Sequence, residues 1–317
     1  MDHVPRLSIG LPVYNGETYL AQALDALLGQ SYSDFELIIS DNASTDRTEE
    51  ICRRYLALDR RIRYFRQAVN LGAAANHNFV AEQARGEFFK WASHDDLYGH
   101  QLLERCIEAL DAHPEVVLSH AWEAFINEEG AIIHPVDYRL ATDSPRAPDR
   151  FRDALFVQGG DDLYGVMRTN ILRRTPLHGT YHHAEHTLVA ELALYGPFWQ
   201  VPEVLYFRRD HPDRASREER KRERAARFDP NRANRLRNPV IRLLAEYIWG
   251  YVTAIQRAPL SPADRLRCYG YLICWVASRG LPGSSRRVGQ SPEPTQQGRA
   301  PTGRRRMSSG MRSVNRR

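Results

Sequence analysis

The sequence is poor in cysteine and has no long hydrophobic run. Its 317 residues include four cysteines, and no two of them form a Cys-x-x-Cys pair. This spacing argues against a disulfide framework or a zinc knuckle and is typical of buried thiols in a reducing compartment. The four residues expected to be buried in this way are Cys52, Cys106, Cys268 and Cys274. No stretch reaches the ~18 apolar residues of a membrane-spanning helix, and no signal peptide is recognisable, so we expect a cytoplasmic protein.

Acidic residues are nearly absent from the last part of the chain. From Gly280 to Arg317 there are many arginines and one acid, Glu293, whereas the net charge of the whole chain is only +5. The rest of the chain is therefore closer to neutral, which gives no support for a nucleic-acid partner. We expect residues 281–317 to be disordered and solvated. Contact with an anionic membrane surface is the alternative reading.

Short apolar runs alternate with helical periodicity through the first 120 residues. Strands are expected at 7–13, 35–40, 62–65, 87–92 and 116–121, with a helix after each of the first four. Strict alternation of strand and helix predicts βαβ units. The expected fold class is therefore α/β, with a mostly parallel, Rossmann-like sheet flanked by helices.

The pattern loosens beyond residue 122, where Pro135, Pro145 and Pro148 are expected to punctuate a loop. Further helices are expected at 150–157, 186–195, 239–255 and 262–279, and a late strand at 202–208. The predicted division is 1–121 for the regular first half, 122–216 for the less regular second part, 217–280 for amphipathic helices and 281–317 for the basic tail. The two amphipathic helices are expected to pack on the preceding part of the chain or to form a homodimer, and peripheral membrane contact is the alternative.

Polar segments follow three of the predicted strands: residues 12–15, 41–46 and 93–96. In an open parallel sheet the carboxyl ends of the strands meet at one edge, where ligands bind. Taken singly, 41–46 is typical of an Asx turn, and Asp95 with Asp96 of a helix N-terminus. Taken together, the segments predict a ligand site, because adjacent carboxylates can hold Mg²⁺ or Mn²⁺ that bridges to phosphate oxygens.

The residues that form these segments resemble those of family 2 glycosyltransferases, which have the GT-A fold. The similar runs are LSIGLPVYNGETYLAQALDALLGQSYSDFELIISDNASTD, NLGAAANHN and FKWASHDDLY, in that order. The resemblance extends over roughly residues 5–215 and implies a nucleotide-sugar donor, with no nucleic acid involved. It makes 1–121 the nucleotide-sugar-binding half and 122–216 the acceptor-binding and catalytic half. It implies inverting transfer to a hydroxyl acceptor on a sugar, a lipid-linked group or another molecule, in cell-surface polysaccharide or glycolipid synthesis. Because no Gln-x-x-Arg-Trp element occurs, we expect single addition.

The resemblance also implies roles for residues on the donor side. The nucleoside pocket would be lined by Pro12, Val13, Tyr14, Asn15 and Glu17. Asp41 would accept a hydrogen bond from the base, and a carboxylate suits the N3–H of uracil. Further contacts with the nucleotide sugar would come from Asn42, Asn70, Gly72, Asn78, His94 and Asp95. His77 stands where the family often has arginine, and a neutral histidine is expected to bind the diphosphate less firmly.

The metal and base positions depart from the family pattern. The family's Asp-x-Asp becomes Ser93-His94-Asp95, so we assign the metal contact to Asp95 and Asp96. His211 is a further candidate for metal or diphosphate, or a structural loop residue. Glu185 stands where the family more often has an aspartate as catalytic base, although a helix N-terminal acid is an equal alternative. The pair Asp161-Asp162 is expected to be a turn or an acceptor contact.

Other functions fit parts of the sequence. Residues 182–186, HHAEH, match the H-x-x-E-H pattern of a zinc peptidase, which would leave the first half unexplained. A nucleotidyltransferase or a Rossmann dehydrogenase would need a glycine-rich phosphate loop after the first strand, which is missing. A GT-A module that binds nucleotide but has impaired catalysis remains an alternative, because the first aspartate of the metal motif is absent.

Overall fold

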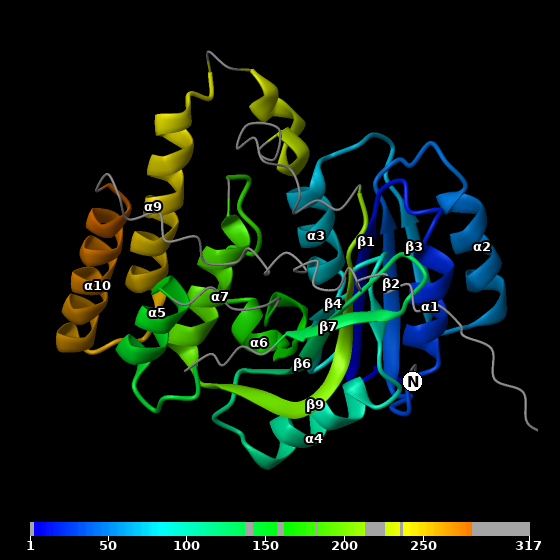
Figure 1. Cartoon of the computed structure of the whole chain (residues 1–317), viewed down its shortest axis with the longest axis horizontal. Helices are drawn as coiled ribbons and strands as arrows, with labels where there is room; N and C mark the ends of the chain where they lie inside the picture. Colours follow the sequence, from blue (N-terminus) through cyan, green and yellow to red (C-terminus); the bar gives the residue numbers. More distant parts are fainter. Residues whose placement is uncertain are drawn as a thin grey trace, which may run out of the picture. The chain divides into compact units, whose positions relative to one another are not determined.

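Seven-residue apolar runs form the two strands that lead to the predicted ligand edge. β1 (Leu7–Val13) and β2 (Phe35–Asp41) are buried at every position, as expected for strands covered on both faces. The other elements of the N-terminal half are α1 (Leu20–Leu28), α2 (Thr48–Leu58), β3 (Ile62–Arg66), α3 (Ala73–Glu82) and β4 (Phe88–Trp91). The predicted alternation of strand and helix is present here (Figure 1).

The computed structural model describes residues 3–136, 142–156, 162–181, 183–212, 226–234 and 237–280. These residues lie within one compact unit, 1–281. The tail 281–317, predicted to be disordered, lies outside the described residues. The predicted domain boundaries at 121, 216 and 280 stay predictions.

The second half adds strands of both directions. Its elements are β5 (Leu97–Tyr98), α4 (Leu102–Ala112), β6 (Leu118–Ile126), β7 (Ile132–Val136), α5 (Ala147–Phe156), the 3₁₀ turn Asp162–Tyr164, β8 (Val166–Arg168), α6 (Thr169–Leu172), α7 (Ala184–Tyr195), β9 (Phe198–Arg209), the 3₁₀ turn Pro230–Ala233, α9 (Val240–Arg257) and α10 (Pro262–Gly280). The sheet order is β3-β2-β1-β4-β8-β6-β9-β5, with β7 paired to β6. The first four strands are parallel, while β8, β5 and β7 run antiparallel to their neighbours.

Alternating side chains of the strands divide the core between the two faces of the sheet. In β4, Phe88 packs with α1, α2 and α4 on one face, and Phe89 packs with α3, α6 and α7 on the other. The register pairs Val13 of β1 with Asp41 of β2, so these two strands end side by side. The loops that follow them therefore start from the same edge.

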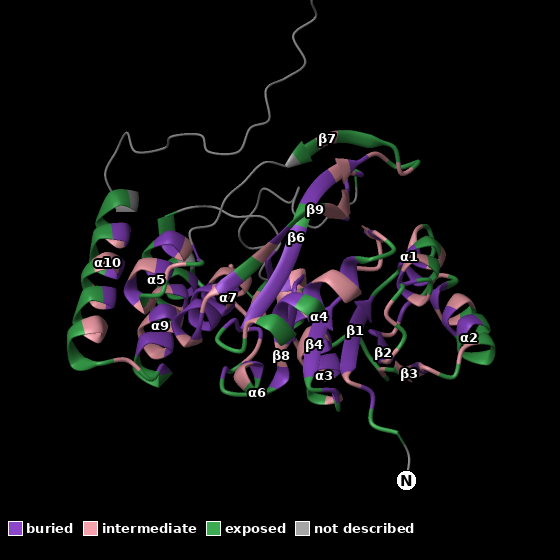
Figure 2. Cartoon of the chain, turned by 90° about the horizontal axis from the view of Figure 1, so that it is seen from below, coloured by how far each residue is buried: buried purple, intermediate pink, exposed green. Residues whose placement is uncertain are grey.

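Two of the three prolines expected in a loop belong to regular elements instead. Pro135 lies in β7, a strand that pairs only with β6 among the described residues, and an edge strand tolerates the missing N–H of proline. Figure 2 shows β7 exposed beside the buried β6. Pro148 lies in the first turn of α5, where the N–H that proline lacks would have had no intrahelical partner. Cys274 is exposed, so the expectation of four buried cysteines is wrong for that residue, which lies on the outer side of α10.

Helices α9 and α10 pack against α5 and α7 through an aromatic cluster. Tyr247, Tyr251 and Trp275 are each at most 6% exposed and lie with Phe151 in one core. This packing accounts for most of the aromatic residues that could otherwise suggest a membrane surface, although Trp249 is 62% exposed. Among the described helices, none combines the length and apolar character required to cross a bilayer.

Candidate functional site

The loop after β1 is hydrogen-bonded to the loop after β2. Asn15 has a positive φ of 52°, its backbone N–H donates to Ser44 Oγ at 2.9 Å, and its side-chain oxygen accepts from Thr45 N–H at 2.8 Å. Glu17 accepts from the N–H of Arg47 at 2.9 Å. The structure therefore brings together two segments that the sequence predicts to meet, with Asn15 and Glu17 fixing their relative position.

Asp41 ends β2 and is fully buried. One carboxylate oxygen accepts from Ser44 N–H at 2.8 Å, and the other accepts from the Tyr64 hydroxyl at 2.9 Å. Burial and this carboxylate raise the pKa of Tyr64, which keeps the phenol protonated as a donor. A carboxylate has about four lone-pair positions, so these contacts leave acceptor capacity on Asp41.

Asn42 connects β2 to the Asn70–Gly72 segment. Its side-chain NH₂ donates to Asn70 Oδ1 at 2.9 Å, and its oxygen accepts from Leu71 N–H at 2.8 Å. Gly72 has a φ of +87°, and a Cβ there would lie 2.5 Å from the carbonyl oxygen of Phe228. Residues 226–234 therefore pack directly on Gly72, one of the residues predicted to contact the nucleotide sugar. The sequence did not indicate this contact.

The remaining residues predicted for the nucleoside pocket differ in exposure. Pro12 and Val13 are buried within β1, whereas Tyr14 is 45% exposed at its end. His94 packs on the β1–α1 loop, because a Cβ on Gly16 would lie 2.7 Å from the His94 ring. The Ser93–Asp96 segment is thus in contact with the loop after β1.

Asp95 and His211 form a pair from distant parts of the chain. Asp95 Oδ2 lies 3.0 Å from His211 Nε2, and the Ser93 hydroxyl donates to Oδ1. Burial alone would raise the pKa of Asp95, but His94, His211 and Ser93 together hold it well below its usual range. One carboxylate oxygen and one imidazole nitrogen therefore converge as the sequence predicts.

The carboxylate of Asp96 is bonded to β9. Its carboxylate accepts from the Arg209 N–H at 2.9 Å and from the Tyr206 hydroxyl, both in β9. Arg209 is fully buried and donates to the Asp95 carbonyl oxygen at 2.8 Å. Asp96 thus joins the loop after β4 to β9, and its assignment as a metal contact stays a prediction.

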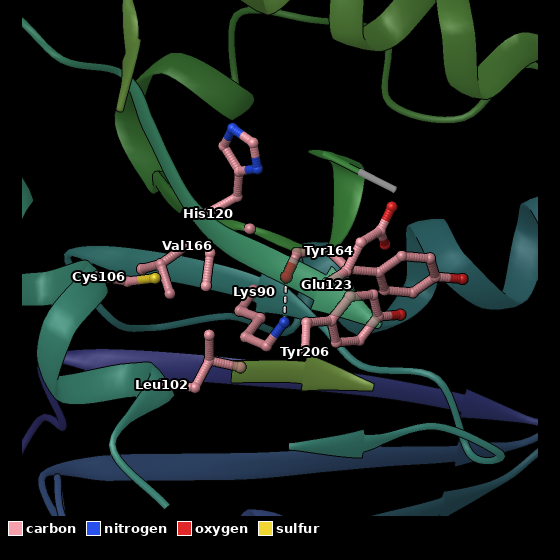
Figure 3. A pocket seen from close by; sticks show the side chains of 10 residues that line it. Lys90, Leu102, Cys106, His120, Glu123, Tyr164, Val166 and Tyr206 are labelled. Carbon is pink, nitrogen blue, oxygen red and sulfur yellow. Dashed lines mark hydrogen bonds between the residues drawn. The ribbon is translucent and has the colours of Figure 1, made fainter. Parts of the chain in front are cut away.

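Beneath this loop Lys90 lies in a small pocket lined also by Leu102, Cys106, His120, Glu123, Tyr164 and Tyr206 (Figure 3). It is 1% exposed, donates to the carbonyl oxygen of Tyr164 and lies 5.5 Å from the ring centroid of Tyr206. Burial lowers the pKa of Lys90 to about 8, and Cys106 and Asp96 oppose that shift. This pocket supports the acidic loop from below but lacks the residues predicted to bind the donor.

Replacing Lys90 with methionine is expected to change the pH dependence of stability. The folded pKa of about 8 lies below the ordinary lysine pKa of 10.5, so the unfolded chain binds more protons between these values. Wild-type stability relative to Lys90→Met therefore rises with pH across this window, by up to ~3 kcal/mol at 1.36 kcal/mol per pKa unit. Urea unfolding of both proteins from pH 7.5 to 10.5 measures the difference.

Leu102→Met, which alters the same pocket without a titrating group, is the matched control. Its difference from wild type should not vary with pH over that range. A Lys90→Met difference that is also constant with pH would contradict the assignment of a depressed pKa to Lys90.

Glu185 lies in the first turn of α7, which begins at Ala184, as expected for a helix N-terminal acid. Burial lowers the pKa of His77, and the charged groups acting on that imidazole include both Glu185 and His94. Burial and His77 also lower the pKa of His178 to about 3, with Glu185 opposing the shift.

Asn78 holds this region together through the backbone. Its NH₂ donates to the His178 carbonyl oxygen at 2.9 Å, and its side-chain oxygen accepts from His178 N–H at 2.8 Å. The rings of His77 and His178 have centroids 5.0 Å apart. The sequence assigned Asn78 to the nucleotide; in the structure it also links α3 to the segment before α7, and no periodic signal predicts such a long-range contact.

Asp161, a predicted turn or acceptor residue, and His182, the first histidine of HHAEH, lie outside the described part of the chain. Asp162, the partner of Asp161 in sequence, is buried, and its Oδ1 lies 3.4 Å from His120 Nδ1. Whether it contacts an acceptor stays a prediction.

Comparison with known families matches residues 8–178, more than half of the chain, to the family model Glycosyl transferase family 2. The chain is 35% identical over 128 residues to an uncharacterized glycosyltransferase of Haemophilus influenzae, covering 40% of this chain and 51% of that protein. It is 38% identical over 107 residues to an uncharacterized glycosyltransferase of Rickettsia typhi, covering 34% and 32% of the two chains. The matched regions thus span about half or less of these relatives.

Solved structures share the architecture at low sequence identity. TarS 1-349 of S. aureus in complex with UDP has a TM-score of 0.61 and 15% identity, covering 87% of this chain and 75% of that one. The mannosyltransferase PcManGT of Pyrobaculum calidifontis, in complex with GDP-Man and Mn²⁺, has a TM-score of 0.51 and 17% identity, covering 87% of both chains. The chain belongs to glycosyl transferase family 2, and its mostly parallel sheet flanked by helices is a GT-A fold.

Proposed function

We propose that the protein transfers a sugar from a uridine diphosphate donor to a hydroxyl acceptor, with inversion at the anomeric carbon. The observation that carries this proposal is the meeting of three loops: the loop after β1 is bonded to the loop after β2 and contacts His94, next to Asp95, whose Oδ2 lies 3.0 Å from His211 Nε2. A group that can bind a diphosphate is thereby placed beside the predicted nucleoside pocket. A sugar on that diphosphate would present its anomeric carbon to a hydroxyl that Glu185 deprotonates.

The donor side is supported by Asp41 and the loops around it. The Asp41 carboxylate can still accept a hydrogen bond from the N3–H of uracil. Tyr14 and Asn15 follow the end of β1, which lies beside the end of β2. TarS 1-349 has been solved with UDP-GlcNAc as well as with UDP, at a TM-score of 0.63 for the former. We therefore favour UDP over other nucleoside diphosphates as the common part of the donor.

Asp95 and His211 fit a divalent cation. Their oxygen and nitrogen atoms are 3.0 Å apart, and carboxylate and imidazole are both ligands of Mn²⁺-type sites, where phosphate oxygens and water complete the shell. Mn²⁺ or Mg²⁺ bound there would neutralise charge on the departing diphosphate. The PcManGT complex contains Mn²⁺, which supports this choice for the present chain.

We assign the role of general base to Glu185. Direct displacement requires the acceptor hydroxyl to lose its proton as it attacks, and a positioned carboxylate can take it. Such a single displacement inverts the anomeric configuration. We propose that the acceptor is the hydroxyl of a sugar, of a lipid-linked group or of a similar molecule, in cell-surface polysaccharide or glycolipid synthesis.

The catalytically impaired binding module is the second candidate, because Ser93 replaces the first aspartate of the family motif. It would bind nucleotide as the transferase does but would not release UDP from a donor sugar. The zinc-peptidase alternative gains no support, because the family assignment accounts for the first half of the chain.

A thermal-shift panel tests the donor assignment. With Mn²⁺ present, UDP at 100 times its Kd should stabilise the protein by ~2.7 kcal/mol, more than GDP or ADP at equal concentration. Mn²⁺ alone and UDP alone are the controls and should each give smaller shifts. No stabilisation by millimolar UDP with Mn²⁺, or equal shifts from all three nucleotides, would contradict the proposal.

A further inference from the structure

Three metal-ligating side chains meet at the start of α7, apart from the Asp95–His211 pair. His183, Glu185 and His186 each offer one ligand atom, and these atoms all lie within 4.8 Å of one another. His183 Nδ1 is 3.7 Å from Glu185 Oε1, and the rings of His183 and His186 have centroids 4.8 Å apart. All three residues are half-buried, so an ion could enter from solvent.

The three ligand groups suit Zn²⁺. Two imidazoles and one carboxylate are a common zinc ligand set that leaves a fourth position open. Ligand atoms bound at ~2.1 Å in a tetrahedral arrangement are ~3.4 Å apart, close to the 3.7 Å between His183 and Glu185. Small side-chain rotations would bring the third ligand, His186, to the same distance.

We propose that His183, Glu185 and His186 bind Zn²⁺, and that the bound ion suppresses sugar transfer by occupying the Glu185 carboxylate. The second half of this proposal rests on the role of Glu185 as base; the first does not. The site differs from a peptidase helix motif, because α7 begins at Ala184 and the first ligand is its N-cap residue. It would make the enzyme sensitive to zinc at a position separate from the cation that serves the diphosphate.

Competition with a chromophoric zinc chelator measures the binding. The measurement is made in the Asp95→Asn background, so that zinc at Asp95 and His211 does not contribute. We expect one Zn²⁺ per chain, and at least ~10-fold weaker binding when His186→Gln or His183→Gln is added. His100→Gln, which changes an exposed histidine elsewhere, is the matched control and should leave zinc affinity unchanged.

Two further measurements separate the loss of the zinc site from misfolding of a variant, and test zinc binding independently of the transferase activity. Co²⁺ in place of Zn²⁺ should give the visible absorption of a four-coordinate site in the Asp95→Asn protein, and lose it with His186→Gln. In the wild-type protein, the rate of UDP release without Zn²⁺ should exceed the rate with Zn²⁺. In His186→Gln the ratio of these two rates should fall towards one. Unchanged zinc affinity and unchanged Co²⁺ absorption in the histidine variants would overturn the site, whatever the transfer assay gives. An undiminished ratio would overturn the inhibitory role.

Discussion

Replacing Glu185 with glutamine is expected to lower the rate of UDP release from the donor sugar by ~10²–10⁴-fold, the usual contribution of a positioned general base. Glutamine keeps the shape of the side chain but cannot accept the proton of the attacking hydroxyl or water. Because Glu185 lies at the start of α7 and not in the loops after β1 and β2, UDP affinity should stay close to wild type. Steady-state release of UDP and calorimetric UDP binding measure the two effects separately.

Glu82→Gln is the matched control, since Glu82 is an exposed acid at the end of α3. It should change neither the rate nor the affinity. A Glu185→Gln enzyme that releases UDP within a few-fold of the wild-type rate would show that Glu185 is only a helix N-terminal acid. Loss of UDP affinity in that variant would instead show that Glu185 contacts the donor.

The second large effect is expected for Asp95→Asn. Asparagine can keep the hydrogen bond from Ser93, and the Arg209 contact to the Asp95 carbonyl oxygen is unaffected. What is lost is the negative charge that faces His211 and a bound cation. Charge neutralisation by a cation is worth several kcal/mol in such reactions, so Mn²⁺-supported UDP release should fall by ~10²-fold or more.

Titration with Mn²⁺ at fixed UDP distinguishes this effect from a general loss of structure. The variant should need more Mn²⁺ for half-maximal UDP binding, while binding of UDP without metal should be unchanged. Asp34→Asn, at an exposed position before β2, is the control and should follow wild type. Equal Mn²⁺ dependence in wild type and Asp95→Asn would remove Asp95 from the metal site.

Most of the fold could be predicted because it depends on local patterns. The apolar runs at Leu7–Val13 and Phe35–Asp41 are long enough to indicate buried strands, and the helical periodicity between strands fixes the α/β class. The meeting of Asn15 with Ser44 follows from the rule that ligand loops lie at the carboxyl ends of parallel strands, whereas His211 was a candidate only through the family resemblance. The fold class and family predicted from these residues are confirmed.

Other features depend on contacts between distant segments and leave no local signal. Asp96 accepts a hydrogen bond from Arg209 of β9, and the sequence gives no sign that this arginine is buried. The burial of Lys90 depends on how β9 and the turn before β8 cover β4. The contact of Phe228 with Gly72 joins segments more than 150 positions apart. Pro135 was interpreted as a loop marker because an edge strand cannot be recognised from one strand alone.

A crystal structure with UDP and Mn²⁺ would show directly whether the three loops form a donor site. We expect uracil beside Asp41 and Asn70–Gly72, the diphosphate and Mn²⁺ at Asp95 and His211, and the β-phosphate side open towards Glu185. UDP bound away from Asp41, or Mn²⁺ held by groups that exclude Asp95, would contradict this expectation.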